Sequence, residues 1–143
     1  MEFEIREIDE TDLNNGYIEL LYEFTNYKYD ISREEFINYL IRMKNINKIV
    51  VIYSFVEKKI IGAGTIFKIE KLHNNPVGQI EDVIISEKYR NKKLGSIIID
   101  KLISIGYNEF NCYKIILNCL EKNIIFYNKN NFSEVGVQMK HNK

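Results

Sequence analysis

The chain of 143 residues carries 20 basic and 20 acidic residues, with 45% hydrophobic and 28% charged residues. This composition is typical of a globular protein, and the length is sufficient for one domain, residues 1–143, with its own core. A formal net charge of zero argues against partners such as nucleic acid or an acidic membrane. No apolar run reaches the roughly 18 residues that a membrane-spanning helix needs.

The N-terminal part predicts a strand followed by two helices. Residues 3–8 alternate apolar and charged side chains, which indicates a half-buried strand. Asp9 or Thr11 can cap the helix that follows. Ser32 and Glu35 have the spacing of a capping box and predict the start of a second helix.

The rest of the chain predicts five further strands and two helices. Strands are predicted at 48–56, 60–69, 77–85, 113–118 and 132–139, and helices at 95–109 and from Asn123 onwards. The first two of these strands form a hairpin. This order predicts an α/β fold with a mixed, mostly antiparallel sheet flanked by helices. Its one strand–helix–strand crossover should be right-handed and parallel.

The two cysteines, Cys112 and Cys119, are seven positions apart. If both lie near one strand, they are too far apart along it to form a disulfide easily. Reduced thiols predict a cytoplasmic protein. The acidic start of the chain does not have the pattern of a secretion signal.

The loop between the strand at 77–85 and the next helix is rich in cations. Arg90, Lys92 and Lys93 precede Gly95, where the helix begins. Unpaired amides and the helix macrodipole favour an anion at such a position, so the loop predicts a phosphate site. A solvated charged loop before an ordinary helix is the alternative, and the loop alone favours it.

Two carboxylates interrupt the apolar strand before this loop. Glu81 and Asp82 lie in mid-strand, where carboxylates are costly unless they are paired or functional. An exposed position at the edge of the sheet is the alternative. His73 and His141 are the only histidines, and neither has metal-ligand spacing, so no metal site is predicted.

The pattern Arg90-x-x-x-x-Gly95 resembles the acyl-CoA pyrophosphate loop of the GNAT superfamily of N-acyltransferases, with Lys93 where the usual pattern has a glycine. The surrounding sequence resembles, more specifically, the glucosamine 6-phosphate N-acetyltransferase family of that superfamily. The residues that carry this resemblance are Gly78–Asp82, Asn111–Leu117, Cys119, Asn123, Phe126, Tyr127, Phe132–Ser133 and Gly136–Met139. The similarity is close from about residue 71 to the end of the chain.

The resemblance implies the GNAT fold, in which the fourth and fifth strands splay apart and the pantetheine arm of acetyl-CoA pairs with the fourth. It implies transfer of acetyl to the 2-amino group of D-glucosamine 6-phosphate without a metal. The products are N-acetylglucosamine 6-phosphate and CoA, in UDP-N-acetylglucosamine biosynthesis. It also implies a homodimer whose subunits share active-site walls.

The resemblance further assigns acetyl-CoA to Val83, Ile84, Ile85, Arg90, Asn91, Lys92, Lys93, Leu94, Gly95, Ser96, Asn123, Phe126 and Tyr127. The Tyr127 hydroxyl would protonate or stabilise the leaving thiolate. From the sequence alone, Tyr127 also fits a half-buried helix residue with an exposed tip. Glu81 would hold the sugar hydroxyls or the amine, and the backbone at Asp82 and Val83 would polarise the amine.

The residues assigned to the acceptor sugar are Thr25, Lys71, His73, Glu81, Asp82, Val83, Lys114, Asn118 and Asn142. Two of them depart from the family. Asn142 stands where the family has a phosphate-binding arginine, and Asn118 stands where it usually has a carboxylate. Because an amide takes no proton at neutral pH, Asn118 is expected to orient the amine through its side-chain oxygen.

Two other functions fit the same fold. One is an N-acetyltransferase that acts on a protein or a polyamine, since a fold does not determine a substrate. The other is a catalytically silent CoA-binding module. Lys71 and His73 favour a phosphorylated acceptor over the first, and the presence of Glu81 and Tyr127 favours catalysis over the second.

Overall fold

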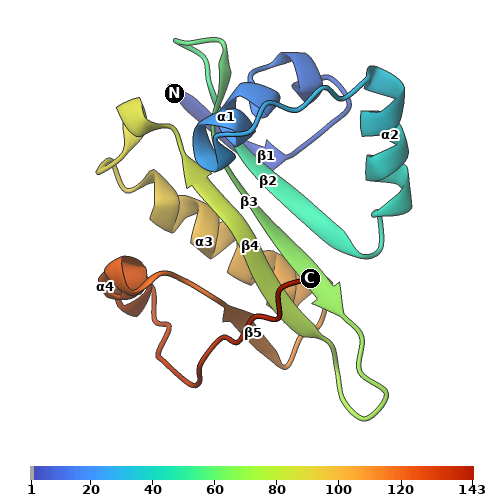
Figure 1. The fold of residues 1–143 in the computed structure, drawn as a ribbon, viewed down its shortest axis with the longest axis vertical. Coiled ribbons are helices and arrows are strands. Elements are labelled where there is room, and N and C mark those ends of the chain that lie inside the picture. Colours follow the sequence, from blue (N-terminus) through green and yellow to red (C-terminus); the bar gives the residue numbers. More distant parts are fainter. Residues whose placement is uncertain (1) are drawn as a thin grey trace.

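The computed structural model of the protein describes residues 2–143. Five strands form one sheet in the spatial order β1-β2-β3-β4-β5 (Figure 1). The pairs β1–β2, β2–β3 and β3–β4 are antiparallel, and the pair β4–β5 is parallel. This confirms the predicted mixed, mostly antiparallel sheet. The strands are β1 (Phe3–Glu7), β2 (Asn47–Ser54), β3 (Lys59–Ile69), β4 (Val77–Ile85) and β5 (Lys114–Leu117).

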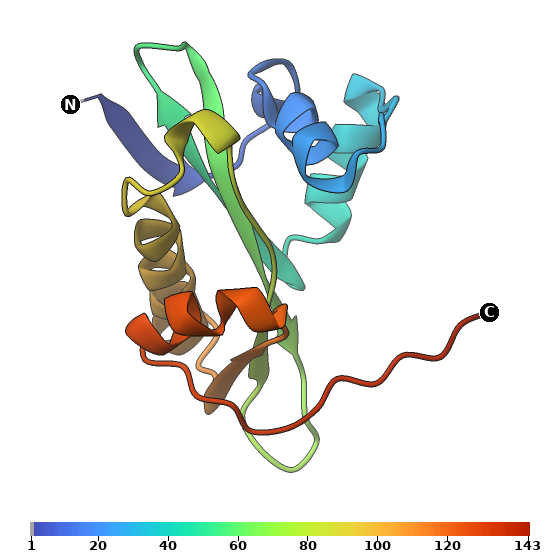
Figure 2. The same cartoon turned by 60° about the vertical axis from the view of Figure 1, so that its left-hand side comes forward.

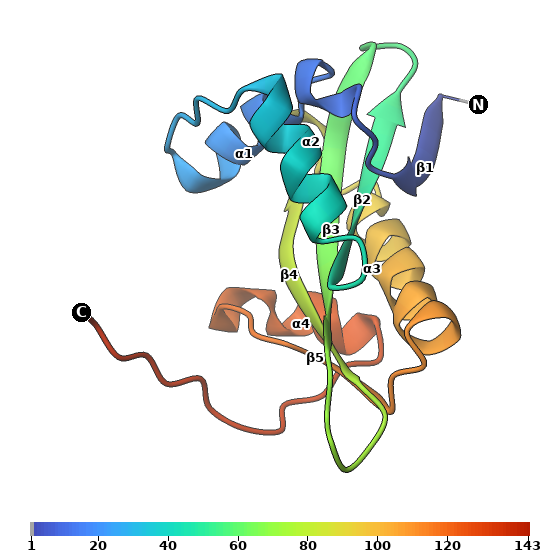
Figure 3. The same cartoon turned by 90° about the vertical axis from the view of Figure 1, so that its right-hand side faces the viewer.

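Helices cover both faces of the sheet, with α1 and α2 on one side and α3 on the other (Figure 3). Alternating residues of β2 explain this arrangement, because successive side chains of a strand point to opposite faces. Val50 and Ile52 are buried in the core cluster that contains α3, whereas Ile49 and Val51 are buried with α1 and α2. The helices are α1 (Tyr17–Thr25), α2 (Arg33–Arg42), α3 (Leu94–Ser104) and α4 (Ile124–Lys129).

The starts of the first two helices test the predicted caps. At α2 the capping box is present, because the Ser32 hydroxyl accepts from the Glu35 N–H and the Glu35 carboxylate accepts from the Ser32 N–H. The predicted cap of α1 is wrong. The carboxylate of Asp9 accepts from the backbone and the hydroxyl of Thr11, in a turn ahead of α1. The helix α1 itself begins after Gly16, whose φ of 91° is accessible to glycine.

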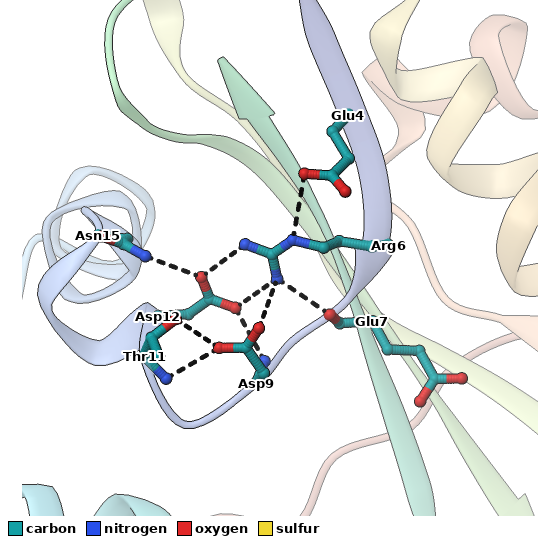
Figure 4. A network of polar contacts seen from close by, with 7 residues as sticks. All are labelled: Glu4, Arg6, Glu7, Asp9, Thr11, Asp12 and Asn15. Carbon is teal, nitrogen blue, oxygen red and sulfur yellow. Dashed lines mark hydrogen bonds and ion pairs between the residues drawn. The ribbon is translucent and has the colours of Figure 1, made fainter. Parts of the chain in front are cut away.

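An ion pair between the partly buried Arg6 and the buried Asp12 joins β1 to this turn (Figure 4). The guanidinium of Arg6 donates to both carboxylate oxygens of Asp12, at 2.7 and 2.9 Å. The N–H of Asp9 and the side-chain amide of Asn15 also donate to Asp12, which is fully buried. Burial opposes the charged form, but these hydrogen bonds outweigh it and lower the pKa of Asp12. The network therefore determines how the chain leaves β1 and enters α1.

The predicted last strand is wrong for the chain by itself. Residues 133–143 belong to no strand or helix, and they extend away from the sheet (Figures 2 and 3). The apolar side chains of this tail alternate, as in a strand, at Val135, Val137 and Met139. All three are 88–90% exposed. The alternation predicts the extended backbone, but a strand also needs a neighbouring edge to pair with.

Candidate active site

The strands β4 and β5 part halfway along β4. Pairing runs from Val77 with Lys114 to Ile80 with Leu117, and the part of β4 from Glu81 to Ile85 has no β5 partner. On the other side of β4, the register with β3 shifts, so that Gly64 faces both Asp82 and Val83. Asp82 has a φ of 53°, which identifies a bulge that bends the strand. The predicted splaying of the fourth and fifth strands is thus confirmed.

The chain after β4 forms the loop that the sequence predicted to bind phosphate. A short 3-10 helix, Glu87–Tyr89, leads into it, and α3 follows directly after Lys93. Asn91 and Lys93 both have left-handed backbones, with φ of 64° and 63°. Lys93 therefore adopts the backbone that a glycine would favour, at a cost of roughly 1–2 kcal/mol. The free N–H groups of the first turn of α3 lie at the end of this loop.

The cations of the loop have no acidic partner among residues 2–143. Arg90, Lys92 and Lys93 are exposed, and none of them forms an ion pair within that range. The Nε atom of Arg90 donates to the carbonyl of Ile85 at 3.2 Å, which leaves the outer guanidinium nitrogens available. The ammonium of Lys92 lies 5.4 Å from the ring centroid of Tyr89. The loop can therefore bind an anion without breaking an ion pair.

The helix α4 packs against the beginning of α3. A Cβ atom added at Gly95 would lie 3.0 Å from the Cζ atom of Phe126, so any larger residue would push the ring of Phe126 aside. The ring of Phe126 in turn lies 4.9 Å from that of Tyr127, edge to face. The loop before α3 and Tyr127 are thereby connected through the ring of Phe126.

Tyr127 of α4 has a half-buried side chain, and its ring also packs edge to face on Phe132. Burial raises the pKa of Tyr127, and the nearby Cys119 raises it further. The hydroxyl therefore keeps its proton at neutral pH, as a proton donor must. Asn123, the other residue assigned to the cofactor in this region, is exposed at the start of α4.

The polar residues of the acceptor side lie around the split in the sheet. Glu81 and Asp82 are exposed, and Glu81 accepts a hydrogen bond of 3.2 Å from the side-chain amide of Gln79. Asn118 follows β5 directly and is exposed as well. The predicted group therefore occurs at one place, where the backbone of β4 becomes free.

Tyr17 of α1 belongs to the same region, and sequence reasoning did not find it. The side chain is buried, and burial raises the pKa of its hydroxyl, with a further contribution from the negative charge of Asp82. In the sequence, its position indicated only the apolar face of a helix. Its proximity to the bulge of β4 depends on how α1 packs on the sheet.

The remaining acceptor candidates are spread over both ends of β4. Thr25 ends α1, and its hydroxyl donates to the carbonyl of Leu21 at 2.9 Å. Lys71 and His73 are exposed in the loop that joins β3 to β4, at the opposite end of β4. The nine residues of β4 span roughly 25–30 Å. One chain therefore does not bring Thr25 together with Lys71 and His73.

The last two candidates, Lys114 and Asn142, lie away from the bulge of β4. Lys114 begins β5, next to the start of β4, and its ammonium lies 5.5 Å from the ring centroid of Tyr113. Asn142 lies in the exposed tail.

The described residues contain no candidate metal-binding group, no helix that could cross a membrane and no disulfide. Within residues 2–143, no group of three or more His, Cys, Asp and Glu side chains is placed to hold a metal ion. Helices long and apolar enough to cross a membrane are absent from that same range. Cys112 is buried, Cys119 is exposed, and both are free thiols.

Comparisons with known proteins agree with this geometry. The model of the Acetyltransferase (GNAT) family matches residues 7–132. A glucosamine 6-phosphate N-acetyltransferase 1 of Dictyostelium discoideum is 37% identical over 139 residues, which cover 94% of this chain and 87% of that protein. The corresponding enzyme of Candida albicans is 30% identical, over 96% of this chain and 93% of that one. The crystal structure of glucosamine-6-phosphate N-acetyltransferase from Arabidopsis thaliana superposes with a TM-score of 0.91 at 30% identity, covering 99% of both chains.

Proposed function

This chain belongs to the GNAT family of acetyltransferases, and we propose that it transfers acetyl from acetyl-CoA to the 2-amino group of D-glucosamine 6-phosphate. The products are CoA and N-acetylglucosamine 6-phosphate, which serves UDP-N-acetylglucosamine biosynthesis. One observation carries the activity: the free half of β4 leads directly into the basic loop at the start of α3. The relatives that match over nearly the whole chain support the identity of the sugar.

Acetyl-CoA fits the groups that the chain leaves free. The backbone of β4 between Glu81 and Ile85 has no β5 neighbour, so the amides of the pantetheine arm can pair with it as an added strand would. The amides of residues 90–96 and the unpaired cations of that loop suit the pyrophosphate. Asn123, Phe126 and Tyr127 form the wall nearest the thioester.

The reaction forms a C–N bond between the sugar amine and the acetyl carbon, and it breaks the C–S bond of the thioester. We assign the proton that the leaving thiolate needs to the hydroxyl of Tyr127, whose raised pKa keeps it protonated. The amine loses its proton to water held by Glu81 and the carbonyl of Asp82. Asn118 orients the amine but accepts no proton.

A homodimer completes this proposal. The tail of residues 133–143 has the alternation of a strand without a partner in the described chain, and its apolar side chains at Val135, Val137 and Met139 are exposed. The strand β5 pairs with β4 alone and lies at the edge of the sheet. Pairing of the tail with a second copy would cover these side chains. It would also bring residues of two subunits to one acceptor site, including Lys71, His73, Lys114 and Asn142.

Sedimentation of two matched variants tests the dimer. Val137→Glu places a charge on the apolar face of the tail and should weaken association, because a buried unpaired carboxylate is costly. Gln138→Glu adds the same charge on the opposite face and should leave association unchanged. A wild-type protein that sediments as a monomer at assay concentrations would contradict the dimer but not the reaction.

The substrate is tested by the release of thiol from acetyl-CoA with three sugars. Glucosamine 6-phosphate should be acetylated, and glucose 6-phosphate, which lacks the amine, should not. Glucosamine without the phosphate should have a kcat/KM lower by about ten- to a hundredfold, since one charge-assisted contact contributes about 1.5–3 kcal/mol. Equal kcat/KM for glucosamine and its phosphate would refute the substrate and favour a protein or polyamine acceptor. The two free thiols are consistent with action in the reducing cytoplasm.

A further inference from the structure

A carboxylate of α1 holds the beginning of the acetyl-CoA loop. Oε1 of Glu23 accepts from the backbone N–H of Glu87 at 2.5 Å, and Oε2 accepts from the hydroxyl of Ser86 at 3.3 Å. Ser86 and Glu87 are the first two residues after β4, more than 60 positions from Glu23 in the sequence. Both carboxylate oxygens of Glu23 therefore accept hydrogen bonds from the residues at which the chain leaves the sheet.

This contact takes the place of a local helix cap. Ser86 precedes the 3-10 helix Glu87–Tyr89, but its own side chain makes no capping hydrogen bond. The first N–H groups of a helix need an acceptor from outside, and Glu23 supplies it for Glu87. The cap of the short helix thus comes from α1, a separate element of the fold.

A second carboxylate holds the same turn from its other side. Glu57, in the turn between β2 and β3, accepts from the hydroxyl of Tyr89 at 2.7 Å and pairs with the ammonium of Lys88. The short helix is therefore fastened to α1 at its first residue and to the β2–β3 turn at its last two.

The loop that follows needs such support, because its own backbone does not favour the observed shape. Asn91 and Lys93 are both left-handed without being glycine. Asparagine adopts this conformation readily, but lysine incurs a steric cost in it, so the backbone at Lys93 makes the loop prone to relax. The groups that would bind phosphates, the loop amides and the start of α3, depend on that shape.

We propose that Glu23 is a positioning residue for acetyl-CoA: it holds the phosphate loop in its binding shape without touching the ligand. This rests on the proposed function only in taking CoA as the ligand of the loop. Glu23 lies in the last turn of α1, so the support for the loop comes from the helix layer on the other face of the sheet from α3.

The sign of the charge separates positioning from direct electrostatics. A carboxylate near a phosphate site repels the anion, so removal of its charge by itself should tighten CoA binding. If Glu23 acts through the shape of the loop, its removal should instead weaken binding. The two effects have opposite directions, which makes the measurement decisive.

The test is calorimetric titration of CoA into wild type and three variants, with the melting temperature of each protein recorded. Glu23→Ala removes both acceptor oxygens and should weaken CoA binding by about three- to tenfold, because only part of the two lost hydrogen bonds is transmitted to the ligand through the loop. Glu23→Gln keeps one oxygen for the Glu87 N–H and removes the charge, so it should bind CoA at least as well as wild type. Glu19→Ala removes an exposed carboxylate from the same helix and should bind CoA like wild type.

A Glu23→Ala protein that melts like Glu19→Ala but binds CoA as tightly as wild type, or more tightly, would overturn the inference. Equal weakening by Glu23→Gln and Glu23→Ala would overturn it too, since the retained acceptor would then have no effect. Failure of wild type to bind CoA at all would instead refute the proposed function. Because the titration contains no sugar, an error about the acceptor does not affect it.

Discussion

Two regions of this protein collect charged side chains, and they use them in opposite ways. At the corner between β1 and α1, Arg6 and Asp12 satisfy each other, and Asp12 has no exposed surface (Figure 4). In the loop before α3, Arg90, Lys92 and Lys93 are exposed and have no acidic partner among residues 2–143. The first arrangement holds the chain together, whereas the second leaves charge available for a ligand.

The difference also appears in the backbone. Around Asp12 the hydrogen bonds come from neighbours within a few residues, so the corner supports itself. The loop before α3 contains two left-handed residues, and the short helix that leads into it donates hydrogen bonds to the distant carboxylates of Glu23 and Glu57. A binding site keeps groups unsatisfied and pays for this with support from elsewhere.

The largest effect is expected at the corner. Asp12→Ala removes several hydrogen bonds to a buried carboxylate, while Arg6 stays partly exposed beside Glu4 and Asp9, so the free energy of unfolding should fall by about 2–3 kcal/mol. Urea denaturation measures it. The control is Glu10→Ala, which removes an exposed ion pair to Arg33 and should cost less than about 1 kcal/mol. Similar losses in both variants would show that the corner is no more important than a surface pair.

The same corner should make the free energy of unfolding depend on pH in the acid range. Because Arg6 and the neighbouring hydrogen bonds lower the pKa of Asp12 in the folded state, its contribution is present above the unfolded pKa of about 3.9. The contribution is lost as the pH falls through the lower folded value. Unfolding free energies measured from pH 6 downwards should therefore fall more steeply in wild type than in Asp12→Ala.

Tyr127→Phe should have the largest effect on catalysis. Without the hydroxyl, kcat should fall by about ten- to a thousandfold, since the proton is needed only as the thiolate leaves. The affinity for CoA should stay unchanged, because the ring still packs on Phe126 and Phe132. Steady-state rates and CoA titration measure the two quantities separately. Equal kcat in both proteins would mean that the thiolate departs without help from Tyr127.

Arg90→Ala should act on binding rather than on chemistry. The KM for acetyl-CoA should rise by about tenfold while kcat changes less, as for an interaction made equally with substrate and transition state. The rise should shrink at high salt, because the contact is exposed. Lys44→Ala, which removes an exposed cation remote from the loop, is the control. An unchanged KM in Arg90→Ala would remove Arg90 from the acetyl-CoA site.

The smallest effect is expected at Asn118. Asn118→Asp should retain activity and extend it to lower pH, because the carboxylate can take the proton of the amine. Asn118→Ala should cost less than the roughly hundred- to ten-thousandfold that loss of a general base costs. The measurement is kcat/KM against pH for the three proteins. Collapse of Asn118→Asp at every pH, with folding intact, would show that the amide itself is required.

Local patterns were sufficient for most of the elements. The alternation of residues 3–8 predicted β1, and the spacing of Ser32 and Glu35 predicted the start of α2. Such patterns work because they report on neighbours within one turn or one strand. The prediction of a strand at 132–139 was wrong because a strand also depends on residues outside its own segment. The alternation of the tail predicts an extended backbone, but the residues of a strand do not show which neighbouring strand it pairs with.

Sequence alone therefore determined the order of the elements from β1 to α4 and the basic loop before Gly95. The roles of Glu81, Asp82 and Tyr127 at the site stay predictions. Only the tertiary structure decided that Glu23 caps a turn 64 positions away and that Tyr17 lies by the bulge of β4. Hydrogen bonds between distant elements leave no periodic signal, because each depends on where two packed layers meet. The left-handed backbone at Lys93 is of the same kind, since a lysine adopts it only where its surroundings compensate the cost.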